Sequence, residues 1–222
     1  MDFFRLLKSL DDLLYEVMSW LVFYPITLWR TVRHPQRMMA YADAELEDAE
    51  AEQYSDTLSP PLFLLVLLVL SHAIELAMVG ESPLVTRMIG FDRLIDSDTS
   101  LLVLRGLLFS MFPFVMATRM VRRQKLALTR RTLRPPFYSQ CYIAAPFALV
   151  MGVSATAMQI PAVWAHIVGI ALLVVALMVY GTLQTRWFAL HLGVSHRRAF
   201  VDASIAMLGS VAMVMFASSL FV

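Results

Sequence analysis

Five apolar stretches constrain this chain more than any other feature. They occupy roughly 61–79, 100–118, 137–159, 162–185 and 201–222. A transmembrane helix needs about 20 mostly apolar residues, because the hydrocarbon core of a bilayer is roughly 30 Å thick. The composition agrees, with 59% hydrophobic residues, 16% charged residues and a mean hydropathy of +0.68. The sequence therefore predicts an all-α, polytopic membrane protein whose transmembrane domain is a five-helix bundle over 60–222.

The distribution of Lys and Arg predicts the orientation of this bundle. Fifteen of the 18 basic residues fall before the first span, between spans two and three, or between spans four and five. With five spans, these three segments lie on one side of the membrane. Short loops rich in Lys and Arg stay in the cytoplasm. The N-terminus is therefore predicted in the cytoplasm and the C-terminus outside, in the inner (plasma) membrane of a bacterium.

The cytoplasmic N-terminal segment, 1–59, begins with an apolar stripe over 3–24 at spacings of three and four residues, which predicts an amphipathic helix. Aromatic residues with bases nearby are typical of a helix in the membrane interface. Packing under the membrane domain or against a sister subunit is the alternative. A short or re-entrant span over 13–29 is disfavoured by Glu16 and Pro25. The candidate interfacial anchors are Phe3, Phe4, Leu7, Trp20, Phe23 and Trp29.

An acidic stretch follows over 43–56, in which seven residues are Asp or Glu. Charge runs of this kind are usually solvated surface. The alternative is docking on a basic partner, for example the protein's own basic segment 119–136.

Polar residues inside the spans are the candidate functional site, because intramembrane charges are costly and are often functional. Counting along the helices places His72, Glu75, Arg105 and His166 at similar depths in the outer leaflet. We expect Glu75 to pair with Arg105, with both histidines nearby. An ion pair that fixes helix register is the structural interpretation. A proton- or ion-coupled site is the functional one, and a catalytic or metal site is less well supported, because this chain has one intramembrane Glu.

Two further groups of residues are expected to contact lipid or neighbouring helices. The basic residues near the cytoplasmic surface are predicted to set topology and to contact anionic headgroups. A ladder of small residues in the third span favours close helix packing in lipid. The basic group comprises Arg119, Arg122, Arg123, Lys125, Arg130, Arg131, Arg134, Arg186, Arg197 and Arg198, and the ladder comprises Ala144, Ala148, Gly152 and Thr156.

Several activities have no support in the sequence. It contains no Gly-rich phosphate loop, no zinc-spaced Cys or His pairs, no HExxH and no serine-nucleophile motif. We therefore predict no metal, no cofactor, no catalytic residue and no nucleic-acid partner.

The layout of about 160 residues, a cytoplasmic segment followed by five closely spaced spans, resembles Yip1-type membrane proteins. The Asp-Leu-Tyr-Gly-Pro signature of eukaryotic members is missing. The segment from Phe23-Tyr24-Pro25 through Tyr41, ending in Leu58-Ser59-Pro60-Pro61, is similar to bacterial chains labelled permeases. Neither resemblance implies a catalytic residue.

These observations favour a non-enzymatic membrane-organising or partner-binding protein, with the bilayer, anionic headgroups and a protein partner or second copy as partners. The first alternative is a small-solute or ion permease that uses the outer-leaflet polar residues. The second is a lipid-acting membrane enzyme or its subunit.

Overall fold

A computed structural model describes residues 2–50, 52–79 and 98–219 of the chain. The described residues form helices joined by short connections and contain no strand. The helices are α1 (Asp2–Arg33), α2 (Pro35–Glu45), α3 (Pro60–Val79), α5 (Asp98–Arg123), α6 (Arg130–Gln159), α7 (Val163–Leu192) and α8 (His196–Ser219).

Five of these helices, α3, α5, α6, α7 and α8, are long and apolar enough to cross a membrane. The predicted all-α class and the five apolar helices are therefore confirmed. The helices extend further than the apolar stretches, because α5 ends and α6 begins within basic sequence. As a result the expected loop 119–136 shortens to 124–129, and the arginines on either side of it lie on helices.

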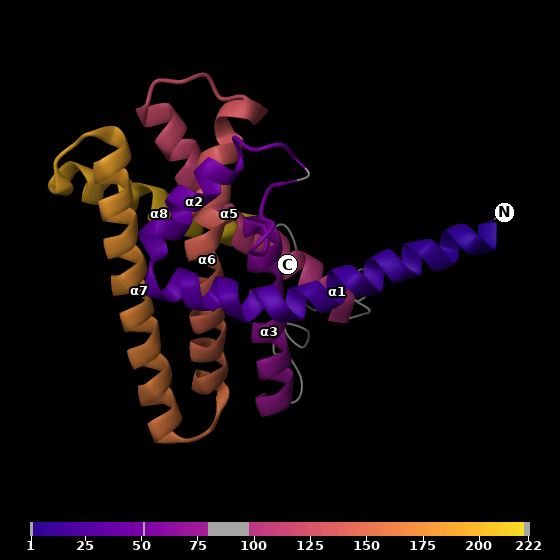
Figure 1. The fold of residues 1–222 in the computed structure, drawn as a ribbon. Helices are drawn as coiled ribbons and strands as arrows, with labels where there is room; N and C mark the ends of the chain where they lie inside the picture. The colour runs from indigo at the N-terminus through magenta and orange to yellow at the C-terminus, as the bar shows by residue number, and fades with distance from the viewer. Residues whose placement is uncertain (1, 51, 80–97, 220–222) are drawn as a thin grey trace.

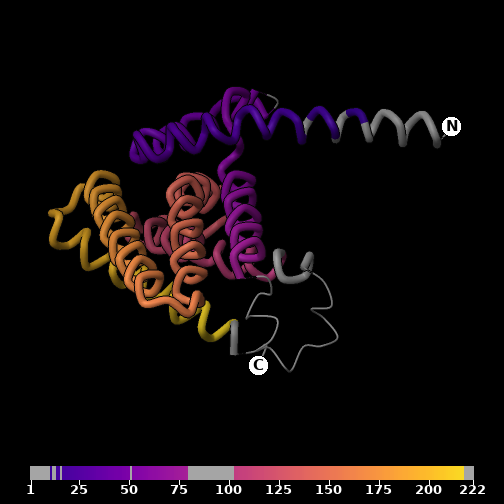
Figure 2. The backbone as a smooth tube through the Cα atoms, turned by 90° about the horizontal axis from the view of Figure 1, so that it is seen from below, coloured from indigo at the N-terminus to yellow at the C-terminus, as the bar shows by residue number. Residues whose placement is uncertain are grey.

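The helices form three layers. Figures 1 and 2 show α3, α6 and α7 side by side, with α1 across one face and α5 and α8 obliquely across the other. The central helix is α6, which contacts α1, α2, α3, α5 and α7. Ala217, in the last described turns of α8, lines a pocket together with Leu104 and Phe114 of α5. The described part of α8 therefore extends along only part of α5. The side of the membrane that holds the C-terminus stays a prediction.

Helix α2 was not expected from the sequence, which favoured solvated surface at its acidic end. It packs on the basic ends of α6 and α7, where the Gln36 side chain donates to the Leu183 carbonyl over 2.9 Å. The Ser139 hydroxyl of α6 donates to Asp43, at the start of the acidic stretch. Part of that stretch is therefore structural, while Glu47, Asp48, Glu50 and Glu52 are exposed.

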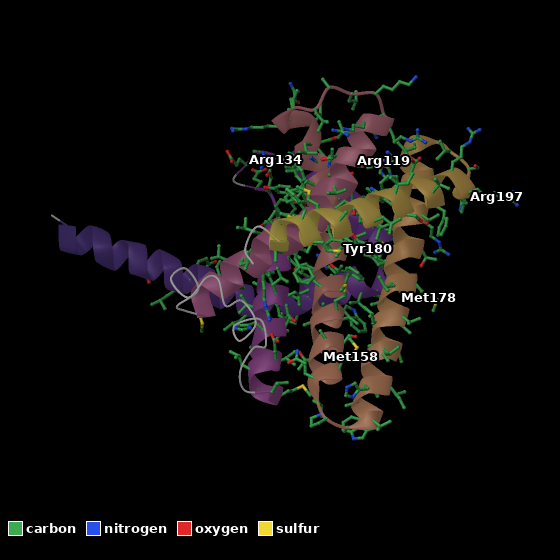
Figure 3. All side chains as sticks on the ribbon, turned by 180° about the vertical axis from the view of Figure 1, so that it is seen from behind. Arg119, Arg134, Met158, Met178, Tyr180 and Arg197 are labelled. Carbon is green, nitrogen blue, oxygen red and sulfur yellow. The ribbon has the colours of Figure 1, made fainter. Side chains whose placement is uncertain are left out.

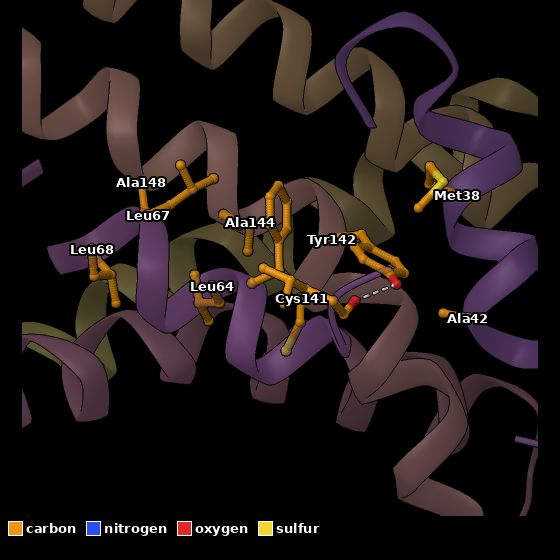
Figure 4. Packing of buried hydrophobic residues seen from close by; sticks show 12 residues of the cluster. Met38, Ala42, Leu64, Leu67, Leu68, Cys141, Tyr142, Ala144 and Ala148 are labelled. Carbon is orange, nitrogen blue, oxygen red and sulfur yellow. Dashed lines mark hydrogen bonds between the residues drawn. The ribbon is translucent and has the colours of Figure 1, made fainter. Parts of the chain in front are cut away.

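The point where the chain enters α3 is fixed by hydrogen bonds from two other helices. Leu58 is buried, its N–H donates to the Thr27 hydroxyl of α1 over 3.0 Å, and its carbonyl accepts from the Tyr142 hydroxyl of α6 over 2.8 Å. Figure 4 shows the Tyr142 bond among the packed side chains of α3 and α6. The Tyr24 ring of α1 packs against Phe63 with ring centroids 6.3 Å apart. Helix α1 therefore crosses the bundle at the level of the first turn of α3.

The small-residue ladder of the third span lies against α3. Ala144, Ala148 and Thr156 are buried, and a Cβ added to Gly152 would lie 1.8 Å from the Ser71 hydroxyl oxygen. This is much closer than two atoms can approach. The same Cβ would lie 3.1 Å from the Ser71 Cβ, so Gly152 allows a close contact between α3 and α6 at this level.

We predict that Gly152→Val destabilises the fold by about 1–3 kcal/mol, because the added side chain must push α3 away from α6. Gly181→Val is the matched control, since nothing lies within 4 Å of a Cβ added there. Thermal unfolding of both variants in detergent measures the difference. Equal stability of the two variants would contradict the observed helix contact.

Candidate functional site

An ion pair inside the apolar helices joins α3 to α5. The Arg105 guanidinium donates to the Glu75 carboxylate, and both side chains are largely buried, at 13% and 7% exposure. The two residues lie in the part of each helix nearest the 80–97 connection. The carboxylate and the guanidinium therefore compensate each other's charge, because little water can reach either group.

His72 lies beside this ion pair, one turn before Glu75 on α3. Its Nδ1 is 3.7 Å from the Glu75 carboxylate, and the side chain is almost fully buried. Neither ring nitrogen has a hydrogen-bond partner among the described residues. His72 therefore adds a titratable group to the pair.

The structure does not bring His166 to this group. Its side chain is exposed on α7, where Nδ1 lies 3.0 Å from the Ala162 carbonyl oxygen. Figure 2 shows α6 standing between α3 and α7. Matched depth along the helices could place His166 at the right level, but it could not determine which helices are neighbours.

A cavity of about 330 Å³ opens between α3, α5 and α6, with Glu75 and Arg105 in its wall. Ser71 and Gln159 add two further polar side chains, and the other lining residues are mostly apolar, for example Leu68, Phe109 and Met151. A buried carboxylate, a guanidinium and two neutral polar groups in one wall can hold a small anion or exchange a proton. Among the described residues, no group of His, Cys, Asp and Glu is arranged to hold a metal ion.

A second charged cluster lies at the opposite end of α5, and the sequence did not predict its pairing. Asp202 of α8 is buried and accepts from Arg119 over 2.6 Å and from Arg123 over 2.7 and 2.9 Å. These two arginines were expected to contact lipid headgroups. Their position along the chain could have identified this pairing, because Asp202 lies near the start of the fifth span, at the same end of the bundle as the end of the second span.

The other basic residues near this end are exposed. They are Arg122, Lys125, Arg130, Arg131, Arg134, Arg186, Arg197 and Arg198. Figure 3 shows Arg119, Arg134 and Arg197 together at one end of the molecule, away from Met158 at the other. The Arg134 guanidinium lies over the Tyr138 ring, 5.2 Å from its centroid.

The interfacial-anchor residues separate into two groups. Trp20 and Phe23 pack partly against the α3–α6 core, whereas Trp29 is 64% exposed. The side chains of Phe3, Phe4 and Leu7 lie outside the described residues. Among the described residues, the candidate anchor consists of the exposed apolar residues of α1 from Leu14 onward, and the assignment of Phe3, Phe4 and Leu7 stays a prediction.

A polar network ties α1 to the segment that enters α3. Asp56 accepts from Arg30 over 2.7 Å and from Tyr41 over 2.6 Å. Burial raises the pKa of Tyr41, with the hydrogen bond to Asp56 adding to the effect, so its hydroxyl stays protonated and donates. Partial burial of Asp56 favours its neutral form, but the hydrogen bonds from Tyr41 and Arg30 outweigh it and hold the pKa below its usual value.

Comparison with protein-family models, curated proteins and solved structures gives no match. The resemblance to Yip1-type proteins and to permease-labelled chains stays a prediction.

We predict that Arg105→Leu costs about 3–5 kcal/mol of stability, because it leaves the buried Glu75 carboxylate without its guanidinium partner. The double variant Glu75→Leu/Arg105→Leu should recover most of that loss, because neither charge remains. Thermal unfolding in detergent measures both variants. If the double variant is no more stable than Arg105→Leu, the two residues are not energetically coupled.

We also predict a loss of stability at low pH that depends on Asp56. Since its pKa is lower in the folded than in the unfolded protein, its contribution is present above the ordinary carboxyl pKa of 3.8 and is lost as the pH falls through the folded value. Asp56→Asn should lower stability at neutral pH and flatten this acid dependence. The exposed Glu50→Gln serves as the control. An unchanged pH profile in Asp56→Asn would refute the role of the network.

Proposed function

We propose that this protein is a non-enzymatic, multi-pass membrane protein that organises the cytoplasmic surface of a bacterial inner membrane through α1. The observation that carries the proposal is the placement of α1. It lies across α3, α6 and α7 rather than along them, and its N-terminal half extends beyond the other helices (Figures 1 and 2). A protein partner or a second copy would contact this extended half.

The lengths of the neighbouring helices support an interfacial position for α1. Helix α1 crosses near Leu58 and Pro60 of the α3 entry, near Tyr142 of α6 and near Tyr180 of α7. From that level to the far ends, the stretches 60–79, 142–159 and 163–180 measure about 26–29 Å at a rise of roughly 1.5 Å per residue. This length matches the hydrocarbon core of a bilayer. The remaining turns of α6 and α7 would extend into the cytoplasm, where α2 packs on them.

The surface of α1 also suits the interface. Leu14, Met18, Leu21, Trp29 and Val32 follow one another at intervals of three or four residues, except across the position of Pro25, and all are more than half exposed. Exposed Val22 and Ile26 widen this apolar band. Residues on the other side of α1, including Thr27 and Thr31, pack against the bundle. An apolar band of this size would be unfavourable in water and would be stabilised by contact with lipid.

The test is the depth of Trp29 in a bilayer. In a variant with Trp20, Trp164 and Trp187 replaced by Phe, we expect Trp29 fluorescence to be quenched most by lipids brominated near the headgroup. Ile170→Trp in the same background without Trp29 should be quenched most by lipids brominated deep in the acyl chain, because it lies on the exposed face of α7. Trp29 emission that no brominated lipid quenches would refute the proposal.

One observation favours a permease as the second candidate. The cavity between α3, α5 and α6 reaches the Glu75–Arg105 pair, which is what a binding site for a small anion or a proton relay requires. Because a pore through a single five-helix bundle would be narrow, transport would require an oligomer. Under this proposal the ion pair would open and close with substrate rather than remain fixed.

The two candidates differ in the accessibility of Ala155, an exposed residue in the cavity wall whose replacement leaves the ion pair intact. In a Cys141→Ala background, a permease predicts that Ala155→Cys reacts with a membrane-impermeant thiol reagent and that substrate slows the reaction. The organising role predicts no reaction at this position. Lys125→Cys, in the exposed loop 124–129, serves as the reactive control in opened vesicles.

A further inference from the structure

A second cavity, of about 340 Å³, lies at the corner where α1 turns into α2, and none of the roles considered above uses it. Val32 and Pro35 form one wall, and residues of α6 and α7 form the others. The rings of Phe147 and Tyr180 stack beneath it, with centroids 4.2 Å apart and planes 16° apart. The groove is therefore a preformed space with a rigid aromatic floor.

The lining of this groove is almost entirely apolar. Thr31 and Tyr180 are the only lining residues with polar side chains, and the Thr31 hydroxyl already donates to the Thr27 carbonyl. Val175 and Val179 line it from α7 and are each more than half exposed. In the proposed membrane placement, the groove begins at the level of α1 and runs into the hydrocarbon as far as Leu172. Such a surface suits an alkyl chain, and the Tyr180 hydroxyl is a polar group of a lining residue that has no hydrogen-bond partner among the described residues.

Basic residues lie close in sequence to one end of the groove. The Gln36 side chain donates to the carbonyl of Leu183, a lining residue, and the exposed Arg37 and Arg186 lie one residue from Gln36 and three residues from Leu183. Arg33 lies over the Trp29 ring instead, 5.5 Å from its centroid. The segment 17–42 and the whole of α6 and α7 contain no Asp or Glu. The next acidic residue along α2 is Asp43, whose carboxylate accepts from the Ser139 hydroxyl of α6. Basic pockets between helices on the cytoplasmic side are suited to anionic lipid headgroups.

We propose that this groove binds one acyl chain of an anionic bilayer phospholipid, with Arg37 and Arg186 beside its phosphate. The apolar groove accounts for the acyl chain, and the two exposed arginines account for the preference for a negatively charged headgroup. A bound lipid would fill the space between α1 and α7 and would hold α1 at the interface. The inference rests on the membrane placement proposed above.

The test is native mass spectrometry of the full-length protein in detergent, with added phosphatidylglycerol or phosphatidylcholine of identical acyl chains. We expect the protein to retain phosphatidylglycerol in preference. Val179→Trp and Val175→Trp should fill the groove and abolish retention of both lipids. Val174→Trp is the matched control, because Val174 is equally exposed on α7 but does not line the groove.

The charge contribution is tested separately. Arg37→Gln and Arg186→Gln should each weaken phosphatidylglycerol binding by about fivefold and leave phosphatidylcholine binding unchanged. Arg197→Gln and Arg198→Gln, on exposed arginines at the start of α8, should have no effect. Equal lipid retention by Val179→Trp, Val175→Trp and Val174→Trp would overturn the proposal. A change in oligomer mass in the groove variants without a change in lipid binding would assign the groove to a helix of a second copy, and would also overturn it.

This experiment can fail independently of the proposed function. It is done in detergent and measures lipid at the groove, whereas Trp29 quenching measures the depth of α1 in a bilayer. Normal Trp29 quenching with no lipid retained at the groove would leave the interfacial role in place and remove the lipid site.

Discussion

The buried peptide groups of Leu58 are the constraint on which the arrangement of α1, α3 and α6 depends. Leu58 comes just before α3, where the chain changes direction. Its backbone N–H and carbonyl therefore need hydrogen-bond partners from other segments. The Thr27 hydroxyl accepts from its N–H and the Tyr142 hydroxyl donates to its carbonyl. An unsatisfied buried backbone group costs about 1–3 kcal/mol. These two bonds therefore fix α1 and α6 relative to the start of α3, and with them the level at which α1 crosses the bundle.

The two ion clusters perform different tasks at the two ends of α5. Arg119 and Arg123 are partly exposed while their partner Asp202 is buried, so one end of this cluster can be hydrated. Glu75 and Arg105 are both largely enclosed. Pairing two buried charges contributes little net stability, but removing one partner is strongly destabilising. The Glu75–Arg105 pair is therefore better explained by a role in fixing the contact between α3 and α5, or by a role in a functional site, than by a contribution to stability.

Much of the fold could be predicted from the sequence, because the apolar stretches report directly on the bilayer. Residue counting along the helices also placed Glu75 and Arg105 at one level, and the structure pairs them. His166 was placed at the same level but lies apart, since neighbour relations between helices depend on packing that spacing does not encode. Asp202 pairs with Arg119 and Arg123 rather than with Arg197 and Arg198, which are nearer along the chain. Helix α2 was missed because it has neither a strong apolar period nor a capping residue, and its stability comes from packing on α6 and α7.

The central claim is that the hydrocarbon boundary crosses α7 at the level of α1, near Tyr180. The most direct measurement is a paramagnetic accessibility profile along the exposed face of α7, with nitroxide labels at positions 167, 170, 174, 178, 182, 186 and 190 of protein in bilayers. The account predicts high collision rates with oxygen through Met178 and high collision rates with a water-soluble nickel complex at Arg186 and Leu190. Lipid-like accessibility that continues to Leu190 would contradict it, because α1 would then lie inside the hydrocarbon.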